Sequence, residues 1–317
     1  MSRYVKISCL APPHKEVDAG LSLEDIVLQM IARWEERLQH VLPERPDLIV
    51  LPECCDDPAY DGMQTEWLYE YYRYRGTRIR DFFSGIASAH RCYIAYSAMI
   101  EMPDGTFRNA TQFIDRHGEL CGVYHKNHIT IRQKSTSDTL YGKEANVIQT
   151  DFGRVACLIC FDINFDELLE TYAGQKPDVI VFSSAYHGGL MQAYRAYSCR
   201  AYFAGAIWLP DPCSIVNPVG EVVGESTHFY PFVTRTINLD CAVVHYDYNK
   251  TKLDAMKRKY GAKVGISDPG RLNAFLISSE TEAFTIQDIV REFELELLDD
   301  YWMRCRADRG KPGHLEP

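Results

Sequence analysis

Three apolar segments that have the composition of buried strands each end in a side chain that could do chemistry. Glu53 directly follows residues 48–52, and Lys126 stands two residues after the segment 119–124. Cys160 follows the apolar residues 155–159. Open α/β sheets bind their ligands beyond the carboxyl ends of the strands. A carboxylate, an ammonium and a thiol at such an edge could act as proton acceptor, charge stabiliser and nucleophile.

Cys160 lies where a strand is expected to end and a helix to begin. The helical pattern starts at Phe165, and the positive end of the helix dipole would favour a thiolate. Asn164 followed three residues later by Glu167 fits a capping box, which predicts the helix start at this point. Taken alone, however, the strand pattern favours a buried structural cysteine, because free cysteine is among the most buried residue types.

The composition argues against several classes of partner and compartment. The 317 residues carry a formal charge of −10 and show no Lys/Arg-rich run, so neither nucleic acid nor an anionic membrane is an expected partner. No apolar stretch approaches the roughly 18 to 20 residues that span a bilayer. Eleven cysteines are an odd number in a long chain without a signal peptide, which predicts a soluble protein in the reducing cytoplasm.

The hydrophobic periodicity alternates between strands and helices, as in an α/β protein. Strands are expected at residues 4–10, 48–52, 93–101, 109–115, 119–124, 146–150, 154–160, 179–184, 204–209, 214–216, 221–223 and 232–240. Helices are expected at residues 22–41, 67–90, 165–172, 190–202 and 286–305, with residues 248–258 either helical or a solvated face. The polar residues 130–140 lack periodicity and are expected to form a loop over the site.

Three motifs in this order resemble the nitrilase superfamily of carbon–nitrogen hydrolases. They are Leu-Ile-Val-Leu-Pro-Glu at 48–53, Tyr-His-Lys-Asn-His at 124–128, and Leu-Ile-Cys-Phe-Asp-Ile-Asn-Phe-Asp-Glu at 158–167. The resemblance covers about residues 4–245. It implies a four-layer α-β-β-α sandwich with two mixed sheets. It also implies a hydrolase domain at 1–280, a C-terminal helical extension at 281–317, no cofactor or metal, and a homodimer or higher homo-oligomer.

The resemblance implies a Glu-Lys-Cys triad formed by Glu53, Lys126 and Cys160. The Cys160 thiolate would attack a carbonyl carbon, and Glu53 would move the protons. Lys126 and the backbone N–H of Phe161 would stabilise the oxyanion. Cys160-Phe161-Asp162 resembles the Cys-Tyr-Asp of amidases and N-carbamoyl amidohydrolases more than the Cys-Trp-Glu of nitrilases. The predicted function is therefore hydrolysis of a linear amide or N-carbamoyl bond in a small molecule, through a thioester.

The sequence departs from the family in the loop after the lysine, where many members carry a second glutamate. Residues 127–141 contain no Glu, and Asp138 is their only acid. Either Asp138 substitutes for it, another segment supplies a carboxylate, or the site is altered. Asp138, Tyr60 and His187 are the candidates for substrate binding, since each lies in a segment expected to border the site.

Other functions stay open at this level. His187 could pair with Cys160 as in a Cys-His hydrolase. Cys157 and Cys160 form a C-x-x-C pair, but residues three apart in a strand point to opposite faces, which argues against a metal site. A non-catalytic binding protein, a nitrile hydrolase and an acyltransferase of the same superfamily are the remaining alternatives.

Overall fold

The computed structural model describes residues 3–12, 17, 20–58 and 65–316. The chain divides into two compact units. One unit spans Val5–Thr236, and the chain from Ile237 onward forms the other together with the N-terminal residues up to Tyr4. The domain boundary predicted after residue 280 falls inside the second unit, between its last strand and the helices that follow.

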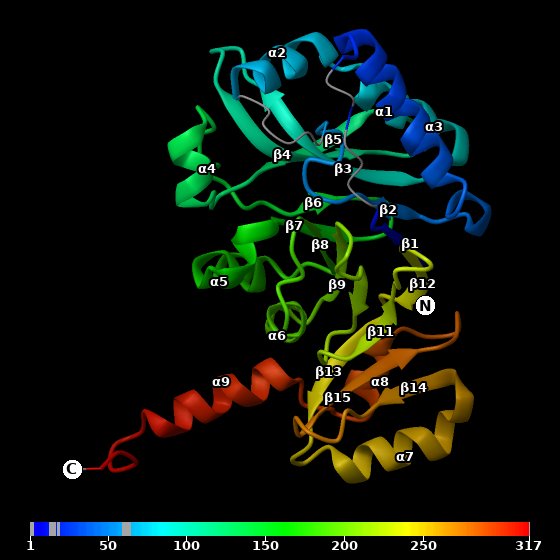
Figure 1. Cartoon of the computed structure of the whole chain (residues 1–317). Helices are drawn as coiled ribbons and strands as arrows, with labels where there is room; N and C mark the ends of the chain where they lie inside the picture. Colours follow the sequence, from blue (N-terminus) through cyan, green and yellow to red (C-terminus); the bar gives the residue numbers. More distant parts are fainter. Residues whose placement is uncertain (1–2, 13–16, 18–19, 59–64, 317) are drawn as a thin grey trace. The chain divides into compact units, whose positions relative to one another are not determined.

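The larger unit is built on two six-stranded mixed sheets (Figure 1). The first has the order β12 (Phe232–Asn238), β1 (Tyr4–Leu10), β2 (Leu48–Val50), β3 (Tyr93–Glu101), β4 (Phe107–Ile114), β5 (Leu120–His125). The second has the order β11 (Val222–Glu225), β10 (Ser214–Val216), β9 (Tyr202–Ile207), β8 (Val179–Ser184), β7 (Arg154–Ile159), β6 (Ile148–Gln149). In each sheet three adjacent strands run parallel, β1, β2 and β3 in the first and β7, β8 and β9 in the second. Antiparallel strands follow β3 in the first sheet and lie on both sides of the parallel strands in the second.

Helices cover the outer face of each sheet, which completes four layers (Figure 1). The first sheet is covered by α1 (Leu23–Leu38), α2 (Thr65–Arg75) and α3 (Arg78–His90), and the second by α5 (Asp166–Gln175) and α6 (Met191–Cys199). The parallel strands β2, β7 and β8 are apolar and buried on both faces, as strands between two layers must be. The predicted α-β-β-α sandwich is confirmed.

Two segments differ from the sequence prediction. The expected loop 130–140 contains the short helix α4 (Ile131–Thr136), which begins where the Thr130 hydroxyl accepts from the Gln133 N–H at 3.1 Å. None of its six side chains is buried, so it has no apolar periodicity to detect. The single helix expected over 67–90 is two helices, α2 and α3, because Gly76 between them adopts a left-handed φ of +52°.

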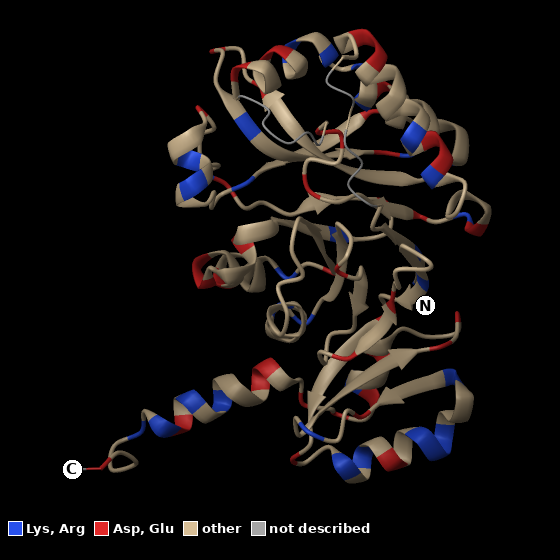
Figure 2. Cartoon of the chain, in the orientation of Figure 1, with Lys and Arg blue, Asp and Glu red and all other residues tan. Residues whose placement is uncertain are grey.

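The smaller unit has an antiparallel sheet of order β13 (Cys241–His245), β15 (Ala274–Ser279), β14 (Val264–Ser267). Its helices are α7 (Lys250–Tyr260), α8 (Ile286–Glu292) and α9 (Leu298–Arg309), and short 3-10 turns occur at Gly261–Lys263 here and at Leu42–Glu44 in the larger unit. The expected tail helix over 286–305 is therefore two helices. Acidic and basic side chains follow one another along α9, where only Leu298 is buried (Figure 2).

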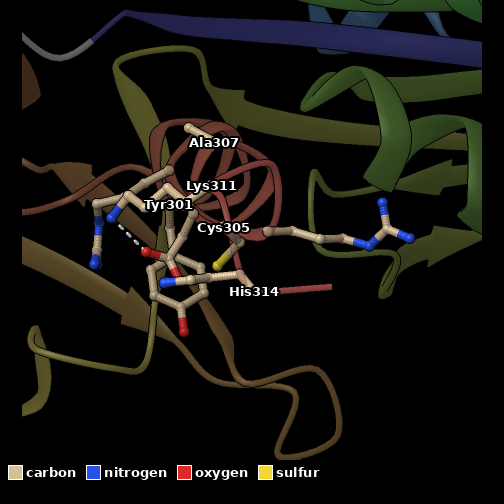
Figure 3. A pocket seen from close by; sticks show the side chains of 8 residues that line it. Tyr301, Cys305, Ala307, Lys311 and His314 are labelled. Carbon is tan, nitrogen blue, oxygen red and sulfur yellow. Dashed lines mark hydrogen bonds and ion pairs between the residues drawn. The ribbon is translucent and has the colours of Figure 1, made fainter. Parts of the chain in front are cut away.

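A cavity of about 510 Å³ lies beside α9 and is lined by charged and aromatic side chains (Figure 3). Tyr301 and Cys305 border it on the helix, and Lys311 and His314 border it on the segment that follows. None of its lining residues belongs to the three sequence motifs. Among the described residues, no helix is long and apolar enough to cross a membrane.

A buried ion pair fixes the chain segment that follows β2. The carboxylate of Asp56 accepts hydrogen bonds from Arg75 at the end of α2 and from the Tyr96 hydroxyl on β3. Asp56 and Arg75 are only 0% and 3% exposed. The Trp34 indole N–H donates to the Cys55 carbonyl at 2.9 Å. These contacts hold the segment that begins with Glu53 against both the sheet and its covering helices.

Replacing Arg75 by leucine should destabilise the fold, because it leaves Asp56 buried without its cation. We expect a loss of about 3–5 kcal/mol in the free energy of unfolding, measured by urea denaturation. The matched control is Arg73→Leu, which removes a half-exposed partner of Glu101 and should cost less than about 1 kcal/mol. Equal losses in the two variants would contradict the assignment of Asp56–Arg75 as the tether.

Candidate active site

The structure brings Glu53, Lys126 and Cys160 together at the carboxyl ends of β2, β5 and β7. The Lys126 ammonium donates to Glu53 Oε1 at 2.6 Å, and the Asn109 amide of β4 donates to the same oxygen at 2.7 Å. The Cys160 thiol forms its side-chain hydrogen bond with the Glu53 carboxylate. Lys126 is 2% exposed and Glu53 is 8% exposed. The carboxylate therefore lies in contact with both the ammonium and the thiol, largely shielded from solvent.

The electrostatics of the three groups set their resting protonation. Burial is the largest single effect and lowers the pKa of Lys126, but the charges of Glu53, Cys160 and Asp162 and the hydrogen bond to Glu53 together leave it above its usual range. Burial and then the Glu53 charge raise the pKa of Cys160 to about 12, against the smaller opposing effects of Lys126 and the Ala185 N–H. The expectation that the helix start favours a thiolate is therefore wrong for the resting protein. Desolvation and the nearby carboxylate dominate, and the thiol is neutral.

Cys160 occupies a sharp turn rather than the first turn of the expected helix. Its φ is +48°, a left-handed conformation that costs a non-glycine residue about 1–3 kcal/mol and is frequent at functional sites. A 3-10 turn, Cys160–Asn164, separates β7 from α5. The predicted capping box is wrong, because Phe165 is the N-cap of α5. The Asn164 amide donates instead to the Phe161 carbonyl and, at 2.8 Å, to the Tyr186 hydroxyl.

The buried carboxylate of Asp162 joins the segments that carry the nucleophile and the ammonium. Its Oδ2 accepts from the Ile159 N–H at 3.1 Å and from the Tyr124 hydroxyl at 2.8 Å. Its Oδ1 accepts from the His128 N–H at 2.7 Å. One donor directly precedes the cysteine, and the other two stand two residues before and after Lys126. A single side chain thus fixes the position of the thiol relative to the ammonium.

The His128 side chain helps to hold the loop that follows Lys126. The His128 ring stacks on Phe165 at 3.7 Å between ring centroids, and its Nε2 lies 3.0 Å from the Glu167 carboxylate. Hydrogen bonding to Asp162 raises the pKa of His128, whereas burial lowers the pKa of His125. Neither ring is among the groups that act on the Cys160 thiol.

The three candidates for substrate binding have different outcomes. Tyr60 lies outside the described residues. Asp138 is exposed and follows α4. The contact with the Tyr69 hydroxyl is made by the backbone N–H of Asp138, which donates a hydrogen bond, and not by its carboxylate. His187 accepts from the Gly189 N–H at 3.2 Å within its own loop, and the groups acting on the thiol are Glu53, Lys126 and Ala185. The structure therefore does not form the Cys-His pair, and it does not bring Asp138 into the triad.

Two aromatic residues at the site were missed by sequence reasoning. The Trp208 indole N–H donates to the Glu53 carbonyl at 2.7 Å. The Tyr186 hydroxyl accepts from the Asn164 amide at 2.8 Å, and burial raises the pKa of Tyr186, as do Cys160 and Glu53, whereas Asn164 and Lys126 lower it. Tyr186 falls in the segment 184–189 that was expected to border the site, but its residue type gave no further signal. Within the described ranges, no cluster of three or more His, Cys, Asp or Glu side chains could hold a metal ion.

A second cavity, of about 670 Å³, lies on the outer face of the first sheet near the turn between α2 and α3. Arg73, Arg75 and Arg80 line it, and each is paired with a carboxylate. Its floor includes Tyr96 and Gln112, which are paired across β3 and β4. None of the triad residues lines it, so this cavity is separate from the catalytic motifs.

The model of the carbon–nitrogen hydrolase family matches residues 27–241, which is more than half of the chain. The chain belongs to this family. The prediction made from the three motifs is therefore confirmed. The match includes Glu53, Lys126 and Cys160 and ends near the boundary between the two structural units.

Curated relatives of this carbon–nitrogen hydrolase include omega-amidases. The omega-amidase NIT2 of Danio rerio is 24% identical over 229 residues, which are 65% of this chain and 81% of that protein. The omega-amidase NIT2-B of Xenopus laevis is 24% identical over 215 residues, 61% of this chain and 76% of that one.

Solved structures with the same fold come from the nitrilase superfamily. Nit3 of Saccharomyces cerevisiae, a member of branch 10 of the superfamily, has a TM-score of 0.62 at 16% identity and covers 85% of this chain and 97% of its own. An amidase from Nesterenkonia sp. has a TM-score of 0.60 at 16% identity, over 82% of this chain and 97% of its own. At these identities the structural likeness shows the fold alone.

Replacing Asp162 by asparagine should impair catalysis by loosening the link between Cys160 and Lys126. Asparagine keeps the shape but turns one acceptor oxygen into an NH₂ group that faces a donor. We expect kcat to fall by about ten- to a hundredfold with a smaller change in KM. The loss of stability should be about 1–3 kcal/mol. Steady-state kinetics and urea unfolding measure the two effects.

The control for this variant is Glu170→Gln, which makes the same change of charge on an exposed position of α5. It should leave both kcat and stability unchanged. Wild-type turnover in Asp162→Asn would show that this carboxylate does not position the site.

Alkylation of Cys160 should report its raised pKa. A thiol with a pKa of about 12 is protonated over the neutral range, so its thiolate fraction rises about tenfold per pH unit from pH 7 to 10. The rate of iodoacetamide labelling at Cys160, resolved by peptide mass spectrometry, should follow that slope. A rate that levels off below pH 9 would indicate an ordinary or lowered pKa and contradict the neutral resting thiol.

Proposed function

We propose that this carbon–nitrogen hydrolase cleaves linear amides of small molecules, with Cys160 as nucleophile, Glu53 as proton carrier and Lys126 as oxyanion stabiliser. The observation that supports these roles most directly is the shared Glu53 carboxylate, which contacts the thiol and accepts from the ammonium at 2.6 Å. A neutral thiol beside a carboxylate is ready to lose its proton as it attacks.

In the first step, the Cys160 sulfur bonds to the carbonyl carbon while its proton passes to Glu53. The carbonyl π electrons move to oxygen, which becomes an oxyanion. The Lys126 ammonium and the Phe161 backbone N–H stabilise that charge, and one such donor typically contributes roughly 3 to 4 kcal/mol. Because Lys126 is buried and held by Glu53, it needs little reorganisation when the charge develops.

In the second step, the oxyanion collapses and the carbon–nitrogen bond breaks. Glu53 returns its proton to the departing nitrogen, so ammonia or an amine leaves and a thioester remains on Cys160. Glu53 then removes a proton from water, which attacks the thioester carbon. The carbon–sulfur bond breaks, the carboxylic acid is released, and the thiol recovers its proton.

The omega-amidase relatives and the Cys160-Phe161-Asp162 sequence support an amide or N-carbamoyl substrate over a nitrile. We further propose a cytoplasmic protein that forms a homodimer or higher homo-oligomer and binds neither nucleic acid nor membrane. No disulfide joins any of the eleven cysteines, all of which are described residues, and this supports a reducing compartment. The division into a hydrolase domain at 1–280 and a helical extension at 281–317 stays a prediction.

Ammonia release from a panel of aliphatic amides, N-carbamoyl amines and nitriles tests the reaction. We expect turnover of amides that falls by at least about a thousandfold in Cys160→Ala and in Glu53→Gln. Intact mass spectrometry of wild-type protein quenched during turnover should show an acyl adduct, mapped to Cys160. The control is Cys305→Ala, which changes an exposed cysteine of α9 and should keep full activity.

Equal turnover in wild type and Cys160→Ala would refute the assigned nucleophile. Absence of both turnover and adduct across the panel would favour the non-catalytic binding protein. Acyl hydroxamate formed when hydroxylamine replaces water would reveal acyl transfer from the same thioester.

A further inference from the structure

The cavity on the outer face of the first sheet has a basic side and an apolar side. Its volume of about 670 Å³ lies in the range of small-molecule sites. The end of α2 and the start of α3 contribute three arginines, Arg73, Arg75 and Arg80. The strands contribute apolar side chains, among them Leu120 and Val123 of β5, which are 44% and 41% exposed. A molecule that fits both sides has a negatively charged head and an apolar body.

Gln112 lines the sheet side of this cavity with an amide that lacks a partner in the described part of the chain. It is paired with Tyr96 on β3 and with Val123 on β5, so it lies in the middle of that side. The residue is only 6% exposed. Its amide forms no hydrogen bond within the described ranges, and neither of its polar atoms is fully enclosed by protein. Because a buried amide without a partner is unfavourable, this position favours a ligand that accepts a hydrogen bond.

Two of the arginines keep N–H donors that the protein does not use. Arg73 donates to Glu101 through Nε alone, at 2.9 Å, and Arg80 donates to Asp81 through Nε and one terminal nitrogen. Among the described residues, the remaining guanidinium nitrogens of both form no hydrogen bond. Each ion pair has an exposed carboxylate or guanidinium, and such pairs contribute little to stability. An anion can therefore share these guanidiniums without breaking a strong pair.

The third arginine gives the cavity a fixed side. Arg75 and Tyr96 both line it, and both bind the buried carboxylate of Asp56. Arg75 also donates to the Met99 carbonyl. These contacts lie inside the protein and hold the two side chains in place without a ligand. The cavity is thus preformed, and a ligand does not bear the entropic cost of ordering this part of it.

We propose that this cavity binds a small organic anion, with a carboxylate-type head held by Arg73, Arg80 and Gln112 and an apolar body against Leu120 and Val123. Three of the lining side chains are cationic, and Glu101 is the one acid among them. This excess of positive charge selects an anion over a neutral or cationic molecule of the same shape. Guanidinium and amide N–H groups form charge-assisted hydrogen bonds with carboxylate oxygens. The site is separate from the triad and does not depend on the proposed reaction.

Three probes separate the contributions of the head and the body in the wild-type protein. Hexanoate carries both, hexan-1-ol lacks the charge, and acetate lacks the apolar body. In calorimetric titrations we expect hexanoate to bind about tenfold or more tightly than either of the others. Equal affinity for hexanoate and hexan-1-ol, or for hexanoate and acetate, overturns the proposal. Absence of hexanoate binding at millimolar concentrations overturns it as well.

Variants of the Arg73–Glu101 pair should change hexanoate affinity in opposite directions. Arg73→Gln removes a cation from the site and should weaken binding about tenfold or more. Glu101→Gln removes the competing acid and should tighten binding about threefold or more. The control is Arg258→Gln, which makes the same change of charge as Arg73→Gln at an exposed position of α7 and should leave the affinity unchanged. Weaker binding in Glu101→Gln contradicts the proposal.

Gln112→Leu separates a ligand-binding role from a structural one. Because the amide lacks a partner, leucine should keep or raise the melting temperature, while hexanoate affinity falls about threefold or more. A lower melting temperature with wild-type affinity shows a structural role and overturns the assignment. Wild-type affinity in both Arg73→Gln and Gln112→Leu refutes the site as a whole.

Alkylation of Cys160 distinguishes this cavity from the triad, since a carboxylate is also a product of the proposed reaction. Protein labelled at Cys160 with iodoacetamide should bind hexanoate with wild-type affinity. If binding is lost on labelling but kept in Arg73→Gln, hexanoate occupies the active site and the proposal fails. If labelled protein binds hexanoate and the wild type hydrolyses no amide, the anion site stands while the proposed function fails.

Discussion

The ion pair between Glu53 and Lys126 is the interaction on which the rest of the site depends. The ammonium and the carboxylate lie 2.6 Å apart and almost without solvent contact, where each charge compensates the cost of burying the other. The thiol of Cys160 adds no charge of its own at rest, because burial and Glu53 keep it protonated. The site therefore holds one positive and one negative charge. During attack the proton of the thiol passes to Glu53, so the negative charge moves from that carboxylate to the oxyanion and the number of charges in the site does not change.

That arrangement places strict demands on the surrounding chain. Each member of the triad follows a different strand, and small shifts between the strands would separate groups that act only in contact. The fold meets this demand with buried polar ties. Asp162 joins the segments of Cys160 and Lys126, and Asp56 with Arg75 fixes the segment of Glu53. The Ser183 hydroxyl, which donates to the Leu51 carbonyl at 2.8 Å, links the two sheets directly.

Sequence reasoning reached the fold and the triad because both depend on strong local patterns. Buried parallel strands appear as continuous apolar runs, and the reactive residue directly follows two of them, at Glu53 and Cys160. These two strands belong to different sheets, and the packing of the sheets against each other brings their ends together. The state of Cys160 could not be reached in this way, because its pKa depends on burial and on Glu53, which is 107 positions away in the chain (160 − 53). The helix dipole was the only local signal for the protonation state of Cys160, and it predicted a thiolate instead of the neutral thiol.

The substrate-binding residues were hard to predict for a related reason. Asp138 and His187 were chosen because their segments border the site, but a side chain in a loop can turn toward its own backbone, as His187 does. The role of Asp56 could not be predicted either, because its cation, Arg75, is 19 positions away in the chain and belongs to the covering helix α2.

The balance of charge in the segment that begins with Glu53 explains how the active site can be both stable and reactive. Pairing Glu53 and Asp56 with cations inside the protein keeps the fold intact without substrate, since an unpaired buried carboxylate in each position would cost several kcal/mol. The same pairing holds the Glu53 carboxylate beside the thiol whose pKa it raises, so the ion pair that stabilises the fold also positions the group that accepts the proton.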